Sequence, residues 1–379
     1  MFAPLAVLVV TGAVAACGSS ASASGTGVVA SGKVSMATSV ATAADSWAVV
    51  PMAADPAFWQ VFARAGNSPS WKLVTPPGVP SNGGIVASAD GASALTVAVR
   101  PSIDLTYSPL ASTADGGASW SPGGPIDAAV AASPGALAAD GSHLAALLSD
   151  GAVETSSDTG ATWSAIAKPG AIAASPAAKA CGGAVAVTSL SFGMTDTEIL
   201  AGGNCGTSGT TAIFSYAPDT GWQRESLPVS GRLVRFTAGT ALVEGKAGLV
   251  ALWLGTGYAG SVTASPAQAS QVLSTSAPLP VSGSITASGT LSDAGAWVLL
   301  SGGRAATVSL TGATGGTPRW VLLPPVPAHT SVLASGPAGS VDALAVSGAT
   351  LTVWRLATGT TTWSRVETIS VPIQYGSSS

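Results

Sequence analysis

The carboxylates are the first residues of this sequence that could do chemistry, because paired Asp and Glu side chains hydrolyse glycosidic bonds. The chain has 18 acidic residues. Three of them, Glu154, Glu198 and Glu244, lie in or near segments expected to be strands and could face a channel. Others, such as Asp150, directly precede a glycine and are typical of turns. No spacing pairs two carboxylates, so a hydrolytic site is the alternative and not the first expectation.

Two further patterns do not indicate a site once their surroundings are considered. Gly255–Gly260 (GTGYAG) matches G-x-G-x-x-G, but no helical pattern follows it and no acid comes about 20 residues later. We expect a glycine-rich loop there. His143 and His329 lie far apart, and neither has another ligand at metal spacing. The sequence therefore predicts no cofactor and no metal site.

The three cysteines divide into one near the N-terminus and one later pair. Cys181 and Cys205 flank two strand-like runs, and an even pair is typical of a disulfide in an oxidising compartment. Closing a loop of this size adds about 3 kcal/mol of stability on the chain-entropy model. The alternative is two free buried thiols. A zinc site is not indicated, because no C-x-x-C accompanies them.

An uncharged apolar run occupies Phe2–Ala16 and ends in small residues. It is shorter than the roughly 20 residues that span a bilayer, and its end is typical of a secretory signal peptide, residues 1–16. Val14-Ala15-Ala16-Cys17 resembles the lipobox of bacterial lipoproteins, which implies that Cys17 is lipidated and becomes the new N-terminus. The sequence departs from that pattern, since no Lys or Arg precedes the run. The alternative is an uncleaved N-terminal helix with an incidental cysteine.

The composition separates a tether from a folded domain. Residues 17–33 follow the signal peptide and are rich in Ser, Gly and Ala, which is typical of a flexible linker, and the folded domain is expected over 34–379. Hydrophobic residues make up 47% of the chain and charged residues 8%. These values argue against a disordered chain and against long amphipathic helices. A net charge of −4 excludes electrostatic binding to nucleic acid.

An internal repeat organises the domain. Thr113–Trp120 (TADGGASW) and Ser156–Trp163 (SSDTGATW) both have the pattern S/T-x-D-x-G-x-S/T-W, which we call the turn motif. The hydroxyl and the carboxylate can bond the amides of a tight turn, the glycine can take a positive φ, and the tryptophan can start the next strand. The residues that we assign to this structural role are Thr113, Asp115, Gly117 and Trp120 in the first copy and Ser156, Asp158, Gly160 and Trp163 in the second.

The turn motif resembles the Asp-box, or BNR repeat, of sialidase-like β-propellers, which lies between the third and fourth strands of a blade. Weaker copies end at Trp71, Trp222, Trp320 and Trp363, and one unit without a tryptophan is expected near 271–273. Seven units at blade spacing predict an all-β, seven-bladed propeller of four-stranded antiparallel blades. Six or eight blades would also be compatible with the motif.

The resemblance to sialidases implies a particular active site, which we looked for residue by residue. A sialidase needs three arginines for the substrate carboxylate, a Tyr/Glu nucleophile pair and an Asp acid/base. The early Phe/Tyr-Arg-Ile-Pro signature of the family is missing. Arg100-Pro101 is the most similar segment, but it falls in the second unit and lacks the other residues of the signature. Arg319 and Arg365 stand beside repeat tryptophans, so their place in the repeat explains them. We therefore assign no catalytic residues.

Together these features predict a lipoprotein on the outer face of the bacterial cytoplasmic membrane, or a secreted protein. Its propeller is expected to be a monomeric, non-catalytic platform that binds an envelope protein or a glycan. The membrane contact is expected through the lipid on Cys17. The alternative is a secreted, sialidase-like glycoside hydrolase with a degenerate or unfamiliar active site.

Overall fold

The computed structural model describes residues 37–42, 44–52, 58–76, 85–90, 93–99, 110–193, 197–206, 208–237, 239–254, 274–281, 283–291, 295–309 and 318–371. The predicted signal peptide and the whole predicted tether, including Cys17, lie outside these residues. So do Arg100 and the G-x-G-x-x-G segment at 255–260.

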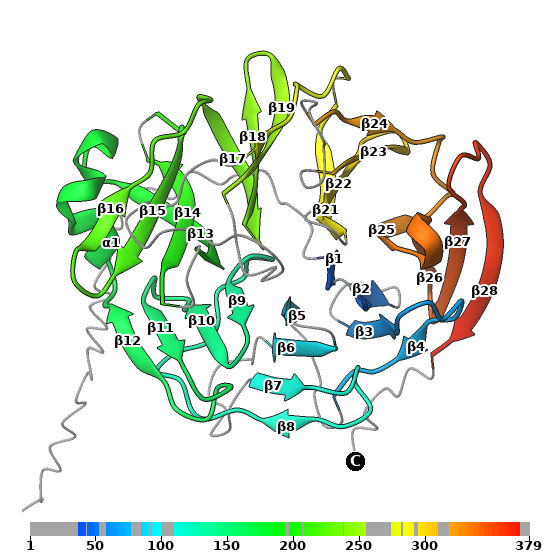
Figure 1. Ribbon diagram of the computed structural model, residues 1–379, viewed down its shortest axis with the longest axis horizontal. Coiled ribbons are helices and arrows are strands. Elements are labelled where there is room, and N and C mark those ends of the chain that lie inside the picture. The colour runs from blue at the N-terminus through cyan, green and yellow to red at the C-terminus, as the bar shows by residue number, and fades with distance from the viewer. Residues whose placement is uncertain are drawn as a thin grey trace, which may run out of the picture.

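Seven four-stranded antiparallel sheets form the blades of a ring (Figure 1). Each blade takes its four strands in chain order from the axis outward, which confirms the predicted seven-bladed propeller. Blades 1 to 4 are β1 (Thr38–Ala41), β2 (Ser46–Met52), β3 (Phe58–Arg64), β4 (Lys72–Leu73); β5 (Ile85–Asp90), β6 (Ala94–Val99), β7 (Leu110–Thr113), β8 (Ser121–Pro122); β9 (Leu137–Asp140), β10 (His143–Leu147), β11 (Val153–Ser156), β12 (Ser164–Ala167); and β13 (Val185–Phe192), β14 (Ile199–Cys205), β15 (Thr211–Ala217), β16 (Gly221–Arg224). Blades 5 to 7 are β17 (Gly231–Thr237), β18 (Thr240–Gly245), β19 (Gly248–Trp253), β20 (Ser274–Thr275); β21 (Ile285–Leu291), β22 (Gly295–Leu300), β23 (Arg304–Ser309), β24 (Val321–Leu322); and β25 (Thr330–Ser335), β26 (Val341–Ser347), β27 (Thr350–Leu356), β28 (Ser364–Ser370).

The repeat tryptophans mark the fourth strand of six blades. Five directly precede such a strand and one lies inside it: Trp71, Trp120, Trp163, Trp320 and Trp363 stand before β4, β8, β12, β24 and β28, and Trp222 lies in β16. In blade 5 the fourth strand starts at Ser274, directly after the unit that was predicted near 271–273, which lies outside the described residues.

A short helical insert joins blades 3 and 4. It consists of α1 (Ala171–Ala174) and the 3₁₀ helix η1 (Pro176–Cys181). Cys181 at its end forms a disulfide with Cys205 at the end of β14, so the insert is held against blade 4. The sequence did not predict these helices, because four to six residues are too few to show a helical period. No helix in the described part of the chain is both long and apolar enough to cross a membrane.

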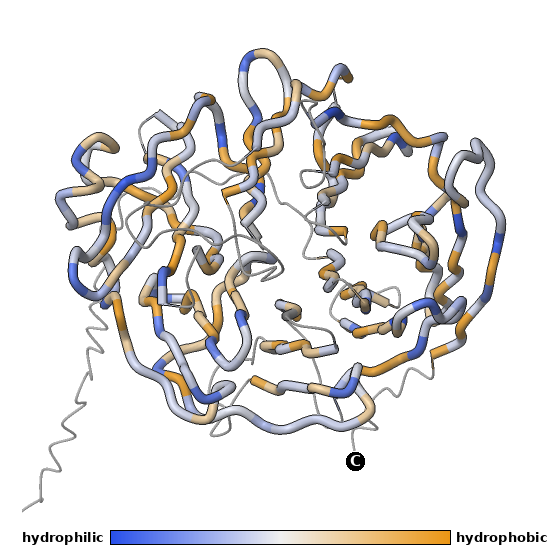
Figure 2. The backbone as a smooth tube through the Cα atoms, viewed as in Figure 1, coloured by the Kyte–Doolittle hydropathy of each residue, from blue (hydrophilic) through white to orange (hydrophobic). Residues whose placement is uncertain are grey.

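The hydrophobic core is distributed around the ring and does not sit at one centre. Trp47, Phe62 and Trp297 are fully buried in the cluster that joins blades 1, 2, 6 and 7, and Phe214 is buried in the cluster that joins blades 2, 3 and 4. Figure 2 shows hydrophobic residues in every blade. This pattern follows from face-to-face packing of sheets, in which both faces of each blade are covered by neighbours.

Side chains close the ring between blade 7 and blade 1, because no described strand is shared by the two sheets. Asp342 of β26 is fully buried at this seam. It accepts a hydrogen bond from Trp71 Nε1 of blade 1 (2.9 Å) and two from Arg355 of its own blade, Nε at 2.7 Å and Nη2 at 2.8 Å. The bonds from Arg355 raise the pKa of that guanidinium above its ordinary value. A fully buried carboxylate thus helps to connect the first and last blades, together with the bond from Trp71 N to Glu367 Oε1 (2.6 Å).

The innermost strand of blade 1 extends the closure to blade 6. Thr38 Oγ1 donates to Ser288 O (3.0 Å) and Ser39 Oγ donates to Thr290 O (2.9 Å), both on β21. Trp297 Nε1 of β22 donates to Ser39 Oγ (2.7 Å). The start of the domain is therefore fixed to two of the last blades.

Replacing Asp342 with Ala is expected to lower the free energy of unfolding by about 3–5 kcal/mol, because Arg355 loses the partner of its charge at a buried site. The measurement is urea unfolding followed by tryptophan fluorescence. The matched control is Glu244→Ala, which breaks an exposed ion pair with Arg232 (2.6 Å, side chains 40% and 45% exposed). That control should cost about 0–1 kcal/mol. Equal costs for the two variants would show that Asp342 does not hold the seam.

Candidate functional site

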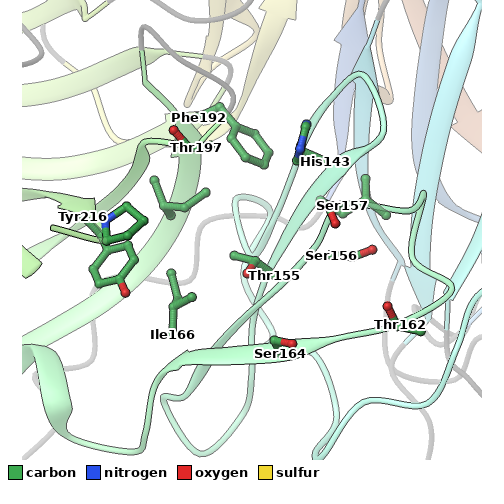
Figure 3. A pocket seen from close by; sticks show the side chains of 13 residues that line it. His143, Thr155, Ser156, Ser157, Thr162, Ser164, Ile166, Phe192, Thr197 and Tyr216 are labelled. Atoms are coloured by element: carbon green, nitrogen blue, oxygen red, sulfur yellow. The ribbon is translucent and has the colours of Figure 1, made fainter. Parts of the chain in front are cut away.

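A groove of about 290 Å³ opens between blades 3 and 4 (Figure 3). Its walls come from both blades and comprise 13 residues. Blade 3 provides His143, Leu144, Thr155, Ser156, Ser157, Thr162, Ser164 and Ile166, and blade 4 provides Phe192, Thr197, Ile199, Tyr216 and Pro218. The volume lies near the lower end of the range for small-molecule sites, roughly 300–1,000 Å³.

The lining combines hydroxyl groups with apolar and aromatic side chains. None of the 13 residues is Asp, Glu, Lys or Arg. Most of the hydroxyls stand on the blade 3 wall, whereas the rings of Phe192 and Tyr216 come from blade 4 (Figure 3). The groove therefore has polar atoms that can orient a ligand, and His143 is the one basic side chain on its walls.

The turn motif of blade 3 fixes part of the groove wall. Asp158 accepts bonds from Ser156 Oγ (2.7 Å), from Thr162 N (2.8 Å) and from Thr162 Oγ1 (2.6 Å). Ser156 Oγ accepts a bond from Gly160 N (2.8 Å), and Gly160 has a φ of 84°, which favours glycine. The hydroxyls of Ser156 and Thr162 are thus held by the turn itself.

The copy in blade 2 makes the same hydrogen bonds. Thr113 Oγ1 donates to Asp115 Oδ1 (2.7 Å), and Ser119 donates to Asp115 through N (2.9 Å) and Oγ (2.6 Å). Gly117 N donates to Thr113 Oγ1 (2.9 Å). In both turns, hydrogen bonds to the aspartate lower its pKa to about 2. The largest effect comes from Ser119 in blade 2 and from Thr162 in blade 3, followed by Thr113 and Ser156, respectively.

Blade 4 positions the aromatic wall through strand pairing. Tyr216 is opposite Ile199 on one neighbouring strand and opposite Trp222 on the other. The ring centroids of Tyr216 and Trp222 are 5.1 Å apart and tilted by 44°. Phe192 is buried and pairs with Ile199. The tryptophan of this repeat therefore supports a ring that lines the groove, a role that its spacing alone did not reveal.

The carboxylates that the sequence singled out lie elsewhere. Glu154 is buried on β11 and is not among the residues that line the groove. Burial raises its pKa, and the charge and hydrogen bond of Asp127 raise it further. Asp127 belongs to the link between blades 2 and 3, and no local pattern marked it as a partner.

A second carboxylate pair lies on blade 4. Burial raises the pKa of Glu225, a hydrogen bond from Ser215 opposes that rise, and the charge of Glu198 adds to it. Glu198 precedes Ile199 and does not line the groove. The third candidate, Glu244, is bound to Arg232 at the surface. The structure thus pairs acids that the sequence could not pair, but none of them lines the groove.

The buried and half-buried arginines lie at blade junctions, two of them at the same one. Arg64 donates through Nε to Ser335 O (3.1 Å) and Arg355 binds Asp342, both at the seam between blades 7 and 1. Arg235 of β17 donates to Ser288 O of blade 6, and burial lowers its pKa to about 9. These arginines join neighbouring blades and do not form a carboxylate-binding triad.

Only one of the two histidines lines the groove. His143 begins β10 at the groove, and His329 adopts a φ of 63° before β25. Across the residues that the structure describes, no group of three or more His, Cys, Asp and Glu side chains could hold a metal ion.

Comparisons with known proteins find likeness in structure alone. No family model matches the chain, and no curated protein matches its sequence. Similar solved structures include a protein from Lactobacillus plantarum (TM-score 0.48, 12% identity, 87% of this chain and 97% of that one) and YCF48 from Cyanidioschyzon merolae (0.45, 14%, 78% and 95%). A fucose-specific lectin from Aleuria aurantia is also similar (0.38, 13%, 90% and 98%).

The double variant Asp115→Asn/Asp158→Asn is expected to change how stability depends on pH. A carboxylate whose pKa falls from 3.8 to about 2 on folding stabilises the protein above pH 4, and this contribution is lost as pH falls toward 2. The difference in melting temperature between wild type and variant should be largest at pH 7 and shrink toward pH 2. A difference that stays constant across this range would contradict the assigned hydrogen bonds.

Proposed function

We propose that this protein is a non-catalytic binding platform whose ligand occupies the groove between blades 3 and 4. The observation that carries the proposal is the wall chemistry of the groove, in which hydroxyls face aromatic and aliphatic side chains. Few, well-placed polar groups in an otherwise apolar concave surface are typical of binding sites.

The placement of carboxylates favours binding over glycoside hydrolysis. Glycoside hydrolysis uses two carboxyl groups that flank the scissile bond, whereas His143 and Tyr216 are the titratable residues that line this groove. The two carboxylate pairs, Asp127 with Glu154 and Glu198 with Glu225, do not line the groove. The sialidase-like alternative would also need three arginines in one site, and Arg64, Arg235 and Arg355 serve blade junctions.

The proposal includes membership of the Asp-box class of propellers. Two observations support this assignment. Both turn motifs make the same set of hydrogen bonds around Asp115 and Asp158. Both also lie between the third and fourth strands of a blade, as the motif does in that class.

We place the platform on the outer face of a bacterial membrane, anchored by a lipid on Cys17. Support comes from the lipobox-like Val14–Cys17 and from the Ser/Gly-rich residues after it. A disulfide between Cys181 and Cys205 is compatible with an oxidising compartment.

The anchor is tested by expressing the full chain in bacteria that are fed a radiolabelled fatty acid. The wild type should carry the label and sediment with membranes. Cys17→Ala should lose the label and leave the membrane fraction, since a thioether-linked lipid needs the thiol. An equally labelled Cys17→Ala protein would contradict the proposal.

The groove is tested by filling it. Ser164→Trp places a large side chain on the groove wall directly after Trp163, and the matched control Ser121→Trp places one at the same repeat position in blade 2. Ser164→Trp should reduce retention of solubilised envelope components at least tenfold while Ser121→Trp leaves it unchanged. The retained ligand should also have the same mass after incubation as before, because a non-catalytic groove does not cleave it. Equal retention by both variants, or a ligand recovered in cleaved form, would contradict a non-catalytic groove.

A further inference from the structure

We infer that the groove between blades 3 and 4 is a saccharide site that takes one or two neutral sugar rings. This inference rests on the proposed binding function and names the ligand class. It is drawn from the hydroxyls, the rings and the absence of Asp, Glu, Lys and Arg along the walls of the groove.

The hydroxyls supply the polar half of the site. Those of Ser156 and Thr162 are already bound to Asp158. Within the described part of the chain, the side-chain hydroxyls of Thr155, Ser157 and Ser164 make no such bond, although they line the same wall. A hydroxyl can donate one hydrogen bond and accept two, so these groups match a ligand that itself carries a row of hydroxyls.

The aromatic wall supplies the apolar half. The face of a ring carries partial negative charge and attracts the polarised C–H bonds of a sugar ring. Tyr216 presents such a ring together with a hydroxyl at its edge, and contact with Trp222 supports its orientation. Phe192 lies on the same wall (Figure 3). A sugar ring has an apolar face of C–H groups and polar hydroxyls around its edge. The apolar face matches the aromatic wall of the groove, and the hydroxyls match the Ser/Thr wall.

The electrostatics disfavour acidic ligands. No Lys or Arg lines the groove and His143 is the one basic side chain on its walls, so an anion would lose its hydration with little cationic compensation. Asp158 stands behind Ser156 and Thr162, and its low pKa keeps it negative at neutral pH. The site should therefore reject sialic acids, uronic acids and phosphorylated sugars.

The geometry also argues against a protein as the occupant of this groove. Stable protein interfaces bury about 800 Å² on each partner. A bound extended peptide would form main-chain bonds with a free strand edge. The groove instead lies between the faces of two sheets, and the strands that carry Thr155 and Tyr216 are paired on both edges within those sheets.

The experiment measures binding of the purified full-length protein to two matched panels of oligosaccharides. One panel contains neutral glucose, galactose, mannose and N-acetylglucosamine units, and the other carries an added sialic or glucuronic acid. At least one neutral member should bind and its acidic counterpart should bind at least tenfold more weakly. Tyr216→Ala should reduce neutral binding at least tenfold, and Tyr216→Phe, which keeps the ring, about two- to fivefold. Ser121→Trp should leave it unchanged.

The outcomes separate this inference from the proposed function. Suppose that no neutral sugar binds, yet Ser164→Trp still abolishes retention of envelope components. The groove then binds another ligand, such as a protein, and the saccharide inference is overturned while the proposed function stands. Equal binding of acidic and neutral panels overturns the neutral specificity. If Tyr216→Ala does not fold, Ser164→Trp serves as the groove variant, and unchanged sugar binding by it overturns the inference.

Discussion

The ring of blades depends on its closure at a seam between blade 7 and blade 1 that includes the fully buried carboxylate of Asp342. Each blade is a continuous stretch of chain, and among the described strands no ladder joins the last blade to the first. Asp342 of blade 7 accepts a bond from Trp71 of blade 1, Arg64 of blade 1 donates to Ser335 O of blade 7, and β1 adds bonds to blade 6. The groove lies between blades 3 and 4, on the side of the ring opposite this seam (Figure 1). The lining residues of the groove all belong to blades 3 and 4, so the residues of the seam do not line the binding site.

The charged residues of this chain act mostly as connectors. Only 8% of the residues are charged, and the buried ones that the structure describes, apart from Glu154, lie at turns and blade junctions. Asp115 and Asp158 organise turns, whereas Asp342, Arg64 and Arg235 link neighbouring blades. A charge is stable in the interior only when it is paired or hydrogen-bonded, so the sites of highest charge density are structural. The groove, in contrast, is lined mainly by hydroxyl, aromatic and aliphatic side chains and by no Asp, Glu, Lys or Arg.

The sequence predicted the features that are local and missed those that arise from packing. The turn motif could be found because all its bonds fall between Ser156 and Thr162, and the blade without the repeat tryptophan could be placed because the repeat tryptophans on either side of it, Trp222 and Trp320, are about two blade lengths apart. The groove could not be predicted, since Thr155 and Tyr216 meet only when two blades pack. The pairing of Glu154 with Asp127 was hidden for the same reason.

Hydrogen–deuterium exchange on the full chain, with and without a bound neutral oligosaccharide, tests the central claim most directly. Ligand in the groove should slow exchange in β11 and β12 of blade 3 and in β14 and β15 of blade 4. Exchange around Asp342 and Trp71 at the seam should not change. Protection confined to other blades or to the strands around the axis would contradict a ligand site between blades 3 and 4.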